Sequence, residues 1–537
     1  MFSSLRGHGR RRWFVLGGVL LVVVGVVAAV LITRQPGNVS HPGVEFTAQP
    51  PPPPAPERPR GKHPIDLGFS WPDYHYDDAR TGSMPLQMPL RPPFVQRWAV
   101  TGRVLIEFPP VICRRSLYLL KNNAALYGVS RLTGKVSWKT KLGYLAASSP
   151  SCGGGSVYAV ILSRGKGIDA GRIVAVDASD GRVRWSRKLP SRSESSPLLY
   201  GGRLYFGTED GTVYALRARD GAVRWTYKAG GAVKGGVAAA DGKLYFGDYS
   251  GKVTAVRRAD GKRLWQSSSA GTAFGLRAGS FYGTPAVAFG RVYLGSLDGF
   301  VYSFGSSDGK LAWRHKTGGY VYSSPAVADP PGVGPSVYVG SYDHKLYCFD
   351  ARSGSVRWTH DAHGTISGGV VVIGDLVFYS NLTKRSTGAL GVATGKLVWG
   401  IGRGAFNPVI SDGRRLYLNG YSSLYMLSTP RQARLDRAAL SGKDATADPA
   451  PSPAARRRAA KRAAARRAAR RERARRRAVA RRVAARRALV HRNLRLRREG
   501  RKVCFRSHGH TTCRIPKPLV CAKRSSDGRT VCRPRRR

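Results

Sequence analysis

Five side chains that could bind a polar ligand share one position in a repeated motif. The motif is two small residues followed by proline, as at 148–150, 195–197 and 323–325. The positions just before this motif, aligned across the chain, hold Glu107, Ala147, Glu194, Lys234, Tyr282, Tyr322, Ile366 and Ala405. If these positions meet at one axis, two acids, one base and two phenols form a candidate ligand-binding ring. The alternative is a water-lined channel without a ligand.

Other constellations of chemically active residues are sparse. His360 and His363 form one close pair, but a metal site needs a third ligand, and a solvated turn explains the pair more simply. The sequence shows no nucleophile elbow, HExxH helix or phosphate-binding glycine loop. We therefore expect neither catalytic residues nor a bound metal.

The cysteines indicate an oxidising compartment. Cys113 and Cys152 end neighbouring inner strands, which makes them a candidate disulfide. Cys348 occupies a site that other repeats fill with Ala, Gly or Ser, which is typical of a small buried residue. Four further cysteines lack the CxxC spacing of zinc knuckles and predict two disulfides in a terminal module at 500–537, with the pairing open: Cys504, Cys513, Cys521 and Cys532.

The elements that must position these residues are read from a tryptophan series. Its members are Trp98, Trp138, Trp185, Trp225, Trp265, Trp313, Trp358 and Trp399. From Trp138 onward, a glycine precedes each tryptophan by four residues and a small residue precedes it by ten. A repeat of roughly 40 to 50 residues built from short alternating strands predicts an all-β propeller with four-stranded blades. In the unit ending at Trp225 the expected strands are 194–200, 203–207, 212–217 and 222–227.

These offsets closely resemble the tryptophan-docking repeats of PQQ-type propellers, a family that includes quinoprotein dehydrogenases and the BamB lipoprotein. The resemblance covers 71–430 and includes a lead-in, WPDYHYDDARTG, at 71–82. It implies that each tryptophan is structural and packs against the next blade in a girdle. After Trp399 only three strands remain, near 405–410, 414–419 and 423–427, so the segment 94–100 is expected to complete an eighth blade.

The segments before the propeller predict a membrane anchor. Residues 13–33 form an uncharged apolar run of 21 residues, long enough as a helix to span a bilayer core. The arginines within 1–12 place the N-terminus in the cytoplasm and the propeller outside it, with a cleaved signal peptide as the alternative. Residues 34–70 are proline-rich and are expected to form a stalk that could extend on the order of 90 Å over 34–64.

The chain carries a formal charge of +59, and more than half of it lies after residue 430. Residues 431–499 include a stretch, 454–499, composed mainly of Ala and Arg, which favours a helix. Its basic clusters recur about every five residues, so charge would surround that helix instead of leaving an apolar face for a membrane. We expect an anionic polymer as partner: cell-wall polymer or lipid headgroups outside the cell, nucleic acid if the tail lay inside.

Three functions fit these features. The preferred one is a non-enzymatic, membrane-anchored binding or assembly scaffold for an unknown protein partner. The alternatives are a PQQ-dependent dehydrogenase, and an extracellular sensor or cell-wall-polymer-binding protein. The resemblance implies that the enzymes carry an adjacent Cys-Cys pair and a calcium ion held by acidic and amide side chains. This chain has no adjacent cysteines, and only Glu107, Glu194 and Asn407 offer themselves for such a calcium, so we expect no cofactor.

Overall fold

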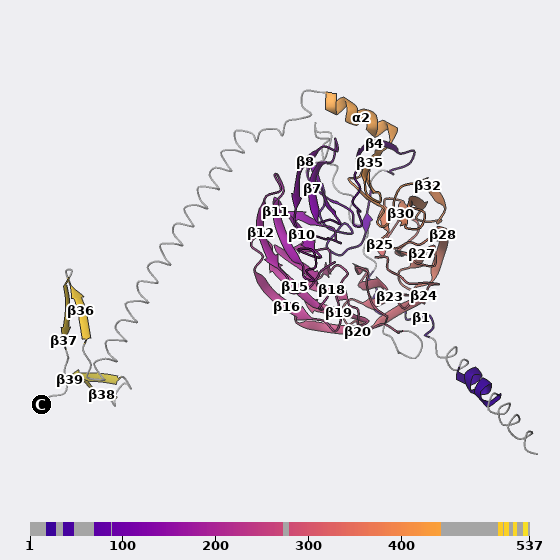
Figure 1. The fold of residues 1–537 in the computed structure, drawn as a ribbon. Coiled ribbons are helices and arrows are strands. Elements are labelled where there is room, and N and C mark those ends of the chain that lie inside the picture. The colour runs from indigo at the N-terminus through magenta and orange to yellow at the C-terminus, as the bar shows by residue number, and fades with distance from the viewer. Residues whose placement is uncertain are drawn as a thin grey trace, which may run out of the picture. The chain divides into compact units, whose positions relative to one another are not determined.

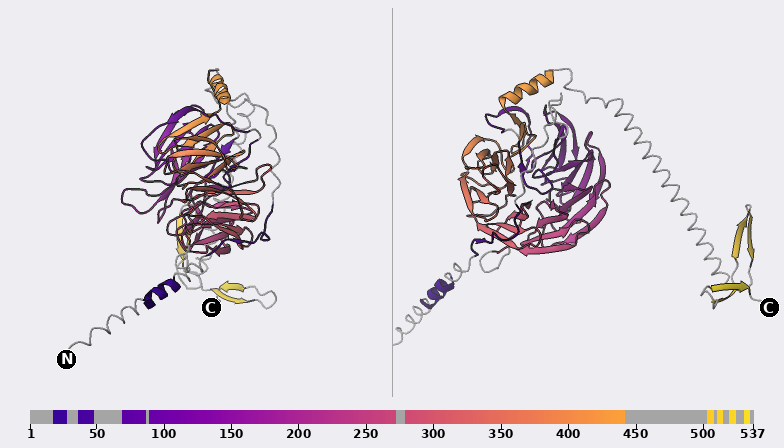
Figure 2. Two further views of the ribbon diagram at one scale, coloured as in Figure 1. Left: turned by 90° about the vertical axis from the view of Figure 1, so that its right-hand side faces the viewer. Right: turned by 180° about the vertical axis from the view of Figure 1, so that it is seen from behind.

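The computed structural model describes residues 18–27, 36–47, 69–86, 89–271, 279–441, 503–507, 510–514, 519–523 and 530–534. The chain divides into two units, Met1–Ala445 and Thr446–Arg537, which are described separately. The first unit contains eight antiparallel four-stranded sheets that follow one another around a ring (Figures 1 and 2). The predicted eight-bladed propeller is confirmed.

The blades are numbered here in ring order, each with its strands from the innermost to the outermost. Blades 1 to 3 are β5 (Val111–Cys113), β6 (Ser116–Lys121), β7 (Ala125–Ser130) and β8 (Val136–Lys141); β9 (Ser151–Gly153), β10 (Ser156–Ile161), β11 (Arg172–Asp177) and β12 (Val183–Lys188); and β13 (Leu198–Tyr200), β14 (Arg203–Gly207), β15 (Thr212–Arg217) and β16 (Val223–Lys228). Blades 4 and 5 are β17 (Ala238–Ala240), β18 (Lys243–Gly247), β19 (Lys252–Arg257) and β20 (Arg263–Ser268); and β21 (Ala286–Ala288), β22 (Arg291–Gly295), β23 (Phe300–Gly305) and β24 (Leu311–Lys316). Blades 6 to 8 are β25 (Ala326–Ala328), β26 (Ser336–Gly340), β27 (Lys345–Asp350) and β28 (Val356–Asp361); β29 (Val371–Ile373), β30 (Leu376–Asn381), β31 (Ser386–Gly391) and β32 (Leu397–Ile401); and β33 (Val409–Ser411), β34 (Arg415–Asn419), β35 (Leu424–Ser428) and β4 (Val95–Val100).

The ring closes through β4, which comes from the N-terminal side of the propeller. It pairs antiparallel with β35, with Trp98 opposite Met426. The expected closure by 94–100 is therefore confirmed, and it gives blade 8 the outer strand that its own segment lacks. The innermost strands are shorter than expected: β13 begins at Leu198, not at residue 194. The ring positions thus lie in the loops that enter the inner strands.

Each indole crosses to the following blade. The small residue ten before a tryptophan lies directly opposite it, as Ala215 does to Trp225, so the ring can lie flat over the sheet. The Trp225 Nε1 donates to the Arg258 carbonyl of blade 4 at 3.1 Å, and five other indoles make the equivalent bond to the next blade. At the two remaining seams, Trp399 packs edge-on against Phe94, and Trp98 lies against Gly134 of blade 1.

Residues 70–84, here called the axial plug, run through the inside of the ring. β2 (Ser70–Trp71) pairs with β5 of blade 1, and β3 (Ser83–Met84) runs parallel to β29 of blade 7. Between them, acceptors of the plug receive amide hydrogen bonds from the inner strands of blades 2 to 7; the donors are Cys152, Leu199, Ala239, Val287, Val327 and Val372. The fully buried Arg80 donates to the carbonyls of Ser196 and Val237. The plug therefore ties successive blades together at the axis.

The two faces of the ring are distinguished by their loops. The cup face carries the loops that enter the innermost strand and join the second strand to the third. The strap face carries the turns that join the first strand to the second and the third to the fourth. Tyr282 precedes β21 and Phe289 follows it, so they mark the cup face and the strap face of blade 5.

Residues 36–47, here called the strap, correct the expectation of a free stalk over 34–64. β1 (Val39–Ser40) pairs antiparallel with β24 and adds a fifth strand to the rim of blade 5. Arg291 donates to the carbonyls of Val44 and Glu45 at 2.6 and 2.7 Å. The error has a physical cause: the strap binds mainly through backbone groups, which composition does not reveal.

The tail boundary at residue 431 also differs from the structure. α2 (Pro430–Ser441) follows blade 8 and is held to it by an ionic network. The Arg415 guanidinium donates to the buried Asp436 carboxylate of α2 and, at 2.9 Å, to Asp412. Asp436 is 2% exposed, so the first turns of the expected tail belong to the propeller.

The remaining segments are described individually. Residues 18–27, within the expected span 13–33, are helical; in the described part of the chain, no helix has both the length and the apolar character needed to cross a membrane. The rest of 13–33 and the Ala/Arg-rich stretch 454–499 lie outside the described residues. In the second unit, β36 (Val503–Ser507) pairs with β37 (His510–Arg514) and β38 (Leu519–Lys523) with β39 (Thr530–Pro534). Cys504 stands opposite Cys513 in the first of these hairpins, and Cys521 stands opposite Cys532 in the second. Cys513 and Cys521 each take part in a disulfide.

Candidate functional site

The structure brings all five polar ring residues together at one cavity of about 270 Å³ on the propeller axis. This cavity, here called the axial cup, is lined by Glu107, Glu194, Lys234, Tyr282 and Tyr322. Each comes from a different blade, because each loop enters its inner strand beside the axis. Three apolar members of the ring, Ala147, Ile366 and Ala405, are buried outside this lining. The axial plug contributes Tyr74 to the cup, and Tyr74 is buried.

Lys234 is the central cation of the cup. Its Nζ lies 3.1 Å from Glu194 Oε1 and 3.1 Å from Glu209 Oε1, and 5.5 Å from the centre of the Tyr249 ring. Burial works to lower the pKa of Lys234, but the two carboxylates outweigh it and raise that pKa. The Tyr282 hydroxyl donates to the other Glu194 oxygen at 3.2 Å. Glu194 is thus held from two sides.

Glu107 occupies the far side of the cup and is held differently. Its carboxylate accepts a hydrogen bond from Asn122 Nδ2 at 2.9 Å. Burial raises the pKa of Glu107, the Asn122 hydrogen bond opposes that rise, and Glu194 adds to it. The Asn407 amide donates to the Glu107 carbonyl and accepts from the Tyr74 hydroxyl at 3.1 Å. Asn407 therefore links the plug to the ring and does not point a free oxygen into the cup.

Sequence reasoning missed a second layer of aromatic residues. Tyr342 packs 4.8 Å from Tyr322, and Tyr249 packs 6.4 Å from Tyr282, measured between ring centres. Glu209, Tyr249 and Tyr342 each stand two residues after the glycine that ends the second strand of their blade. Alignment of the repeats on that glycine predicts this layer, just as alignment on the proline motif predicts the ring.

The lining chemistry suits a cationic group. Burial raises the pKa of Tyr282 and Tyr322, so both phenols remain protonated donors with intact ring faces. Tyrosine rings and carboxylates together attract ammonium and guanidinium groups. Among the cavity-lining side chains, Glu107 and Glu194 give two carboxylates against the one ammonium of Lys234.

The same lining does not fit PQQ with calcium. PQQ carries three carboxylates, and the one ammonium in the lining is already held by Glu194 and Glu209. The Asn407 oxygen already accepts hydrogen bonds from the Tyr74 hydroxyl and the Gly369 amide, so the lining offers calcium only the carboxylates of Glu107 and Glu194, fewer oxygen ligands than that ion takes. In the described parts of the chain, no three His, Cys, Asp or Glu side chains are grouped to hold a metal ion.

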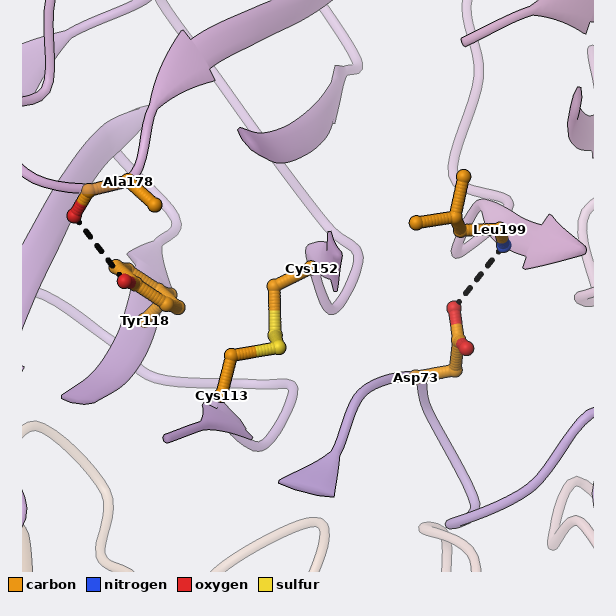
Figure 3. Close-up of a disulfide and its surroundings, with 6 residues drawn as sticks. All are labelled: Asp73, Cys113, Tyr118, Cys152, Ala178 and Leu199. Carbon is orange, nitrogen blue, oxygen red and sulfur yellow. Dashed lines mark hydrogen bonds between the residues drawn. A yellow bond between two sulfur atoms is a disulfide. The ribbon is translucent and has the colours of Figure 1, made fainter. Parts of the chain in front are cut away.

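The other sequence candidates lie away from the cup. Cys113 and Cys152 form the expected disulfide between blades 1 and 2, with their Cα atoms 6.2 Å apart, and neither lines the cup (Figure 3). Cys348 is buried and free. His360 contacts the Tyr379 hydroxyl at 3.1 Å, whereas the exposed His363 pairs with Asp361. The two histidines therefore have separate partners.

A comparison with protein families gives a direct match to this architecture. The profile of the family described as outer membrane protein assembly factor BamB matches residues 122–304 and 284–401. The chain belongs to this family. The matched residues lie in blades 1 to 7 and include Glu194, Lys234, Tyr282 and Tyr322 of the cup, but not Glu107. A comparison with curated protein sequences gives no match.

Solved structures agree on the fold. BamB from Moraxella catarrhalis superposes with a TM-score of 0.51 at 18% identity, covering 63% of this chain and 98% of that one. Quinohemoprotein alcohol dehydrogenase from Comamonas testosteroni gives 0.55 at 14%, covering 68% and 81%. A europium-containing methanol dehydrogenase gives 0.56 at 14%, covering 68% and 99%. At these identities the likeness shows the propeller fold alone, and it includes both an assembly factor and enzymes.

Proposed function

We propose that this chain is a membrane-anchored, extracytoplasmic scaffold without enzymatic activity, and that it binds a protein partner on the cup face. The observation that carries the proposal is the distribution of exposed large hydrophobic residues. In the described loops between propeller strands there are four: Tyr144, Ile168, Tyr320 and Tyr421. All four lie in loops of the cup face. Exposed aromatic residues of this kind are enriched at protein interfaces.

The cup supports the same proposal. Its carboxylates and tyrosine faces match an Arg or Lys side chain of a partner, which could insert at the axis while the surrounding loops hold the partner's backbone. The match to the BamB family, one of whose solved members is named as an assembly factor, is consistent with a partner-binding role. The anchoring part of the proposal rests on the apolar run 13–33.

A surface exchange on the cup face tests the binding role. Tyr320→Ser and Tyr421→Ser remove exposed rings without touching the core, and Val183→Ser and Val223→Ser on the outer strands are matched controls of comparable exposure. The proposal predicts that partner co-purification from membranes falls with the cup-face pair and persists with the outer-strand pair. Equal retention by both pairs would contradict it.

The dehydrogenase alternative is tested on the purified propeller. PQQ and calcium are added together, and the absorption spectrum and melting temperature are recorded with and without them. The scaffold proposal predicts neither a bound-quinone spectrum nor a shift in melting temperature. A stoichiometric quinone spectrum that Glu194→Gln abolishes would support the enzyme instead.

A further inference from the structure

The strap fixes the point at which the tether meets the propeller. Beyond the β1–β24 pairing, Arg314 Nε donates to the Gly37 carbonyl at 2.8 Å, and the Lys316 amide donates to Asn38 Oδ1 at 2.8 Å. The His41 amide donates to the Ala312 carbonyl at 2.6 Å. These bonds hold the beginning of the strap along the outermost strand of blade 5. The strap covers β24, and Trp313 on that strand is 0% exposed.

From the rim the strap continues inward across the strap face of blade 5. The Glu45 carboxylate accepts hydrogen bonds from the Ser307 amide and hydroxyl at 3.0 and 2.5 Å. Phe46 stacks on Phe289 at 5.8 Å, and the Arg291 guanidinium lies 5.3 Å from the centre of the Phe46 ring. The strap is therefore held by the hydrogen bonds of Glu45, an aromatic stack and a cation–π contact, as well as by backbone pairing.

The docking site lies close in sequence to the apolar run. Five residues, or six residue-to-residue steps, separate the end of that run at residue 33 from Val39, the first residue of β1. Even a fully extended chain covers at most about 22 Å over six such steps. If 13–33 spans a membrane, as the proposed function requires, the rim of blade 5 lies within that distance of the lipid surface. The propeller then cannot stand far from the membrane, as a free stalk would allow.

The strap face is chemically different from the cup face. Its turns present exposed cationic side chains from blades 1 to 6; they are Arg114, Arg182, Arg219, Lys262, Lys310 and Arg352. Three of them pair with exposed aspartates of the same turns: Arg182 with Asp180, Arg219 with Asp220 and Lys310 with Asp308. None of the exposed large hydrophobic residues of the described propeller loops lies on this face. A surface that carries cationic side chains next to a membrane tether is attracted to anionic headgroups.

We propose that the strap holds the propeller against the membrane, with the strap face of blade 5 and its neighbours toward anionic lipid headgroups and the cup face outward. The inference rests on the proposed anchoring and deepens it, because it assigns a lipid-binding surface and an orientation. The axial cup and the exposed tyrosines then face the compartment from which a partner would approach.

The test uses the full-length protein in nanodiscs of phosphatidylglycerol and phosphatidylcholine with a headgroup spin label. A fluorophore is attached at Lys262→Cys or Lys310→Cys on the strap face, and at Lys166→Cys on the cup face as the matched control. Cys348 is buried, and the signal of the unsubstituted protein is subtracted. We expect strong quenching at 262 and 310 and little at 166.

A strap variant separates the inference from the anchoring on which it rests. Glu45→Ala with Phe46→Ala removes the side-chain contacts that hold the strap across the strap face, and leaves the pairing of β1 with β24 and the apolar run intact. Quenching at 262 and 310 should then weaken although the protein stays in the nanodisc. Equal quenching at all three sites in anchored protein would overturn the orientation. A chain that fails to enter nanodiscs would overturn the anchoring itself.

Discussion

The Trp225 indole lies against Gly261 of the next blade so closely that a Cβ at residue 261 would stand 2.6 Å from Trp225 Cε3. Gly261 also has a φ of +76°, a conformation that residues with a side chain rarely adopt. The repeated glycine thus has two tasks: it makes the turn between the outer strands of its own blade, and it leaves room for the indole of the preceding blade.

The girdle predicts graded losses of stability. Trp313 is fully buried, so Trp313→Ala should cost about 3–5 kcal/mol, as other buried aromatic truncations do. Trp225→Ala, at a half-buried site, should cost somewhat less. Chemical denaturation followed by circular dichroism measures both free energies of unfolding. Unchanged midpoints in both variants would show that the indoles do not hold the blades together.

The closure of blade 8 predicts that β4 cannot be spared. Replacing 94–100 by a Gly/Ser linker of equal length leaves β35 with an unpaired edge and removes Trp98 from its place against Gly134. The variant should unfold at lower denaturant than the parent and tend to aggregate. Excision of 50–64, which spares the strap, is the control and should leave the midpoint unchanged. Equal midpoints for the two variants would refute the closure.

Asp73 predicts a pH dependence of stability. Burial raises the pKa of Asp73 to about 7, although the nearby Arg80 opposes this. Between about pH 4 and 7 the folded protein therefore holds a proton that the unfolded chain has released, so this stabilising contribution is lost as pH rises through 7. Asp73→Asn should remove this pH-dependent decrease in the free energy of unfolding, which is on the order of a few kcal/mol.

Urea unfolding at pH 5 and pH 8 measures this effect. The parent should lose more stability between the two pH values than Asp73→Asn does. Asp169→Asn, at an exposed carboxylate, serves as the control and should behave like the parent. An Asp73→Asn variant with the parent's pH dependence would contradict the assignment.

The basic tail predicts polyanion binding. A peptide covering 454–499 carries like charges one turn apart, which weakens an isolated helix, so its helicity should rise when an anionic polymer neutralises them. The helicity measured by circular dichroism with the polymer present, and the retention on an anionic matrix, should both fall steeply as salt rises from low to physiological concentration. A peptide of the same length with neutral Gln in place of every Arg is the control. No gain in helicity and no retention would leave the tail as a solubilising segment.

The repeat was predictable from sequence because its signals are local. Residues equivalent to Trp225, Gly261 and Ala215 recur at fixed offsets, and their spacing predicts the strands, the turns and the number of blades. The ring position was also predictable, since Glu194 and Lys234 share one place in the motif. The layer of Tyr249 also has a local signal, the glycine that ends the second strand of each blade. The strap and α2 depend on contacts between distant segments. Gly37 and Ser307 give no sign of such contacts in their own neighbourhoods.

Site-specific photocrosslinking in intact cells tests the central claim, that the cup face is the partner-binding face, most directly. A photoreactive phenylalanine is placed at Tyr320 and Tyr421 on the cup face, and at Arg182 and Arg219 on the strap face. The account predicts a discrete protein adduct from the two cup-face positions, weakened by Glu194→Gln with Lys234→Met, and none from the strap-face positions. Protein adducts of equal yield from both faces, or from the strap face alone, would contradict it.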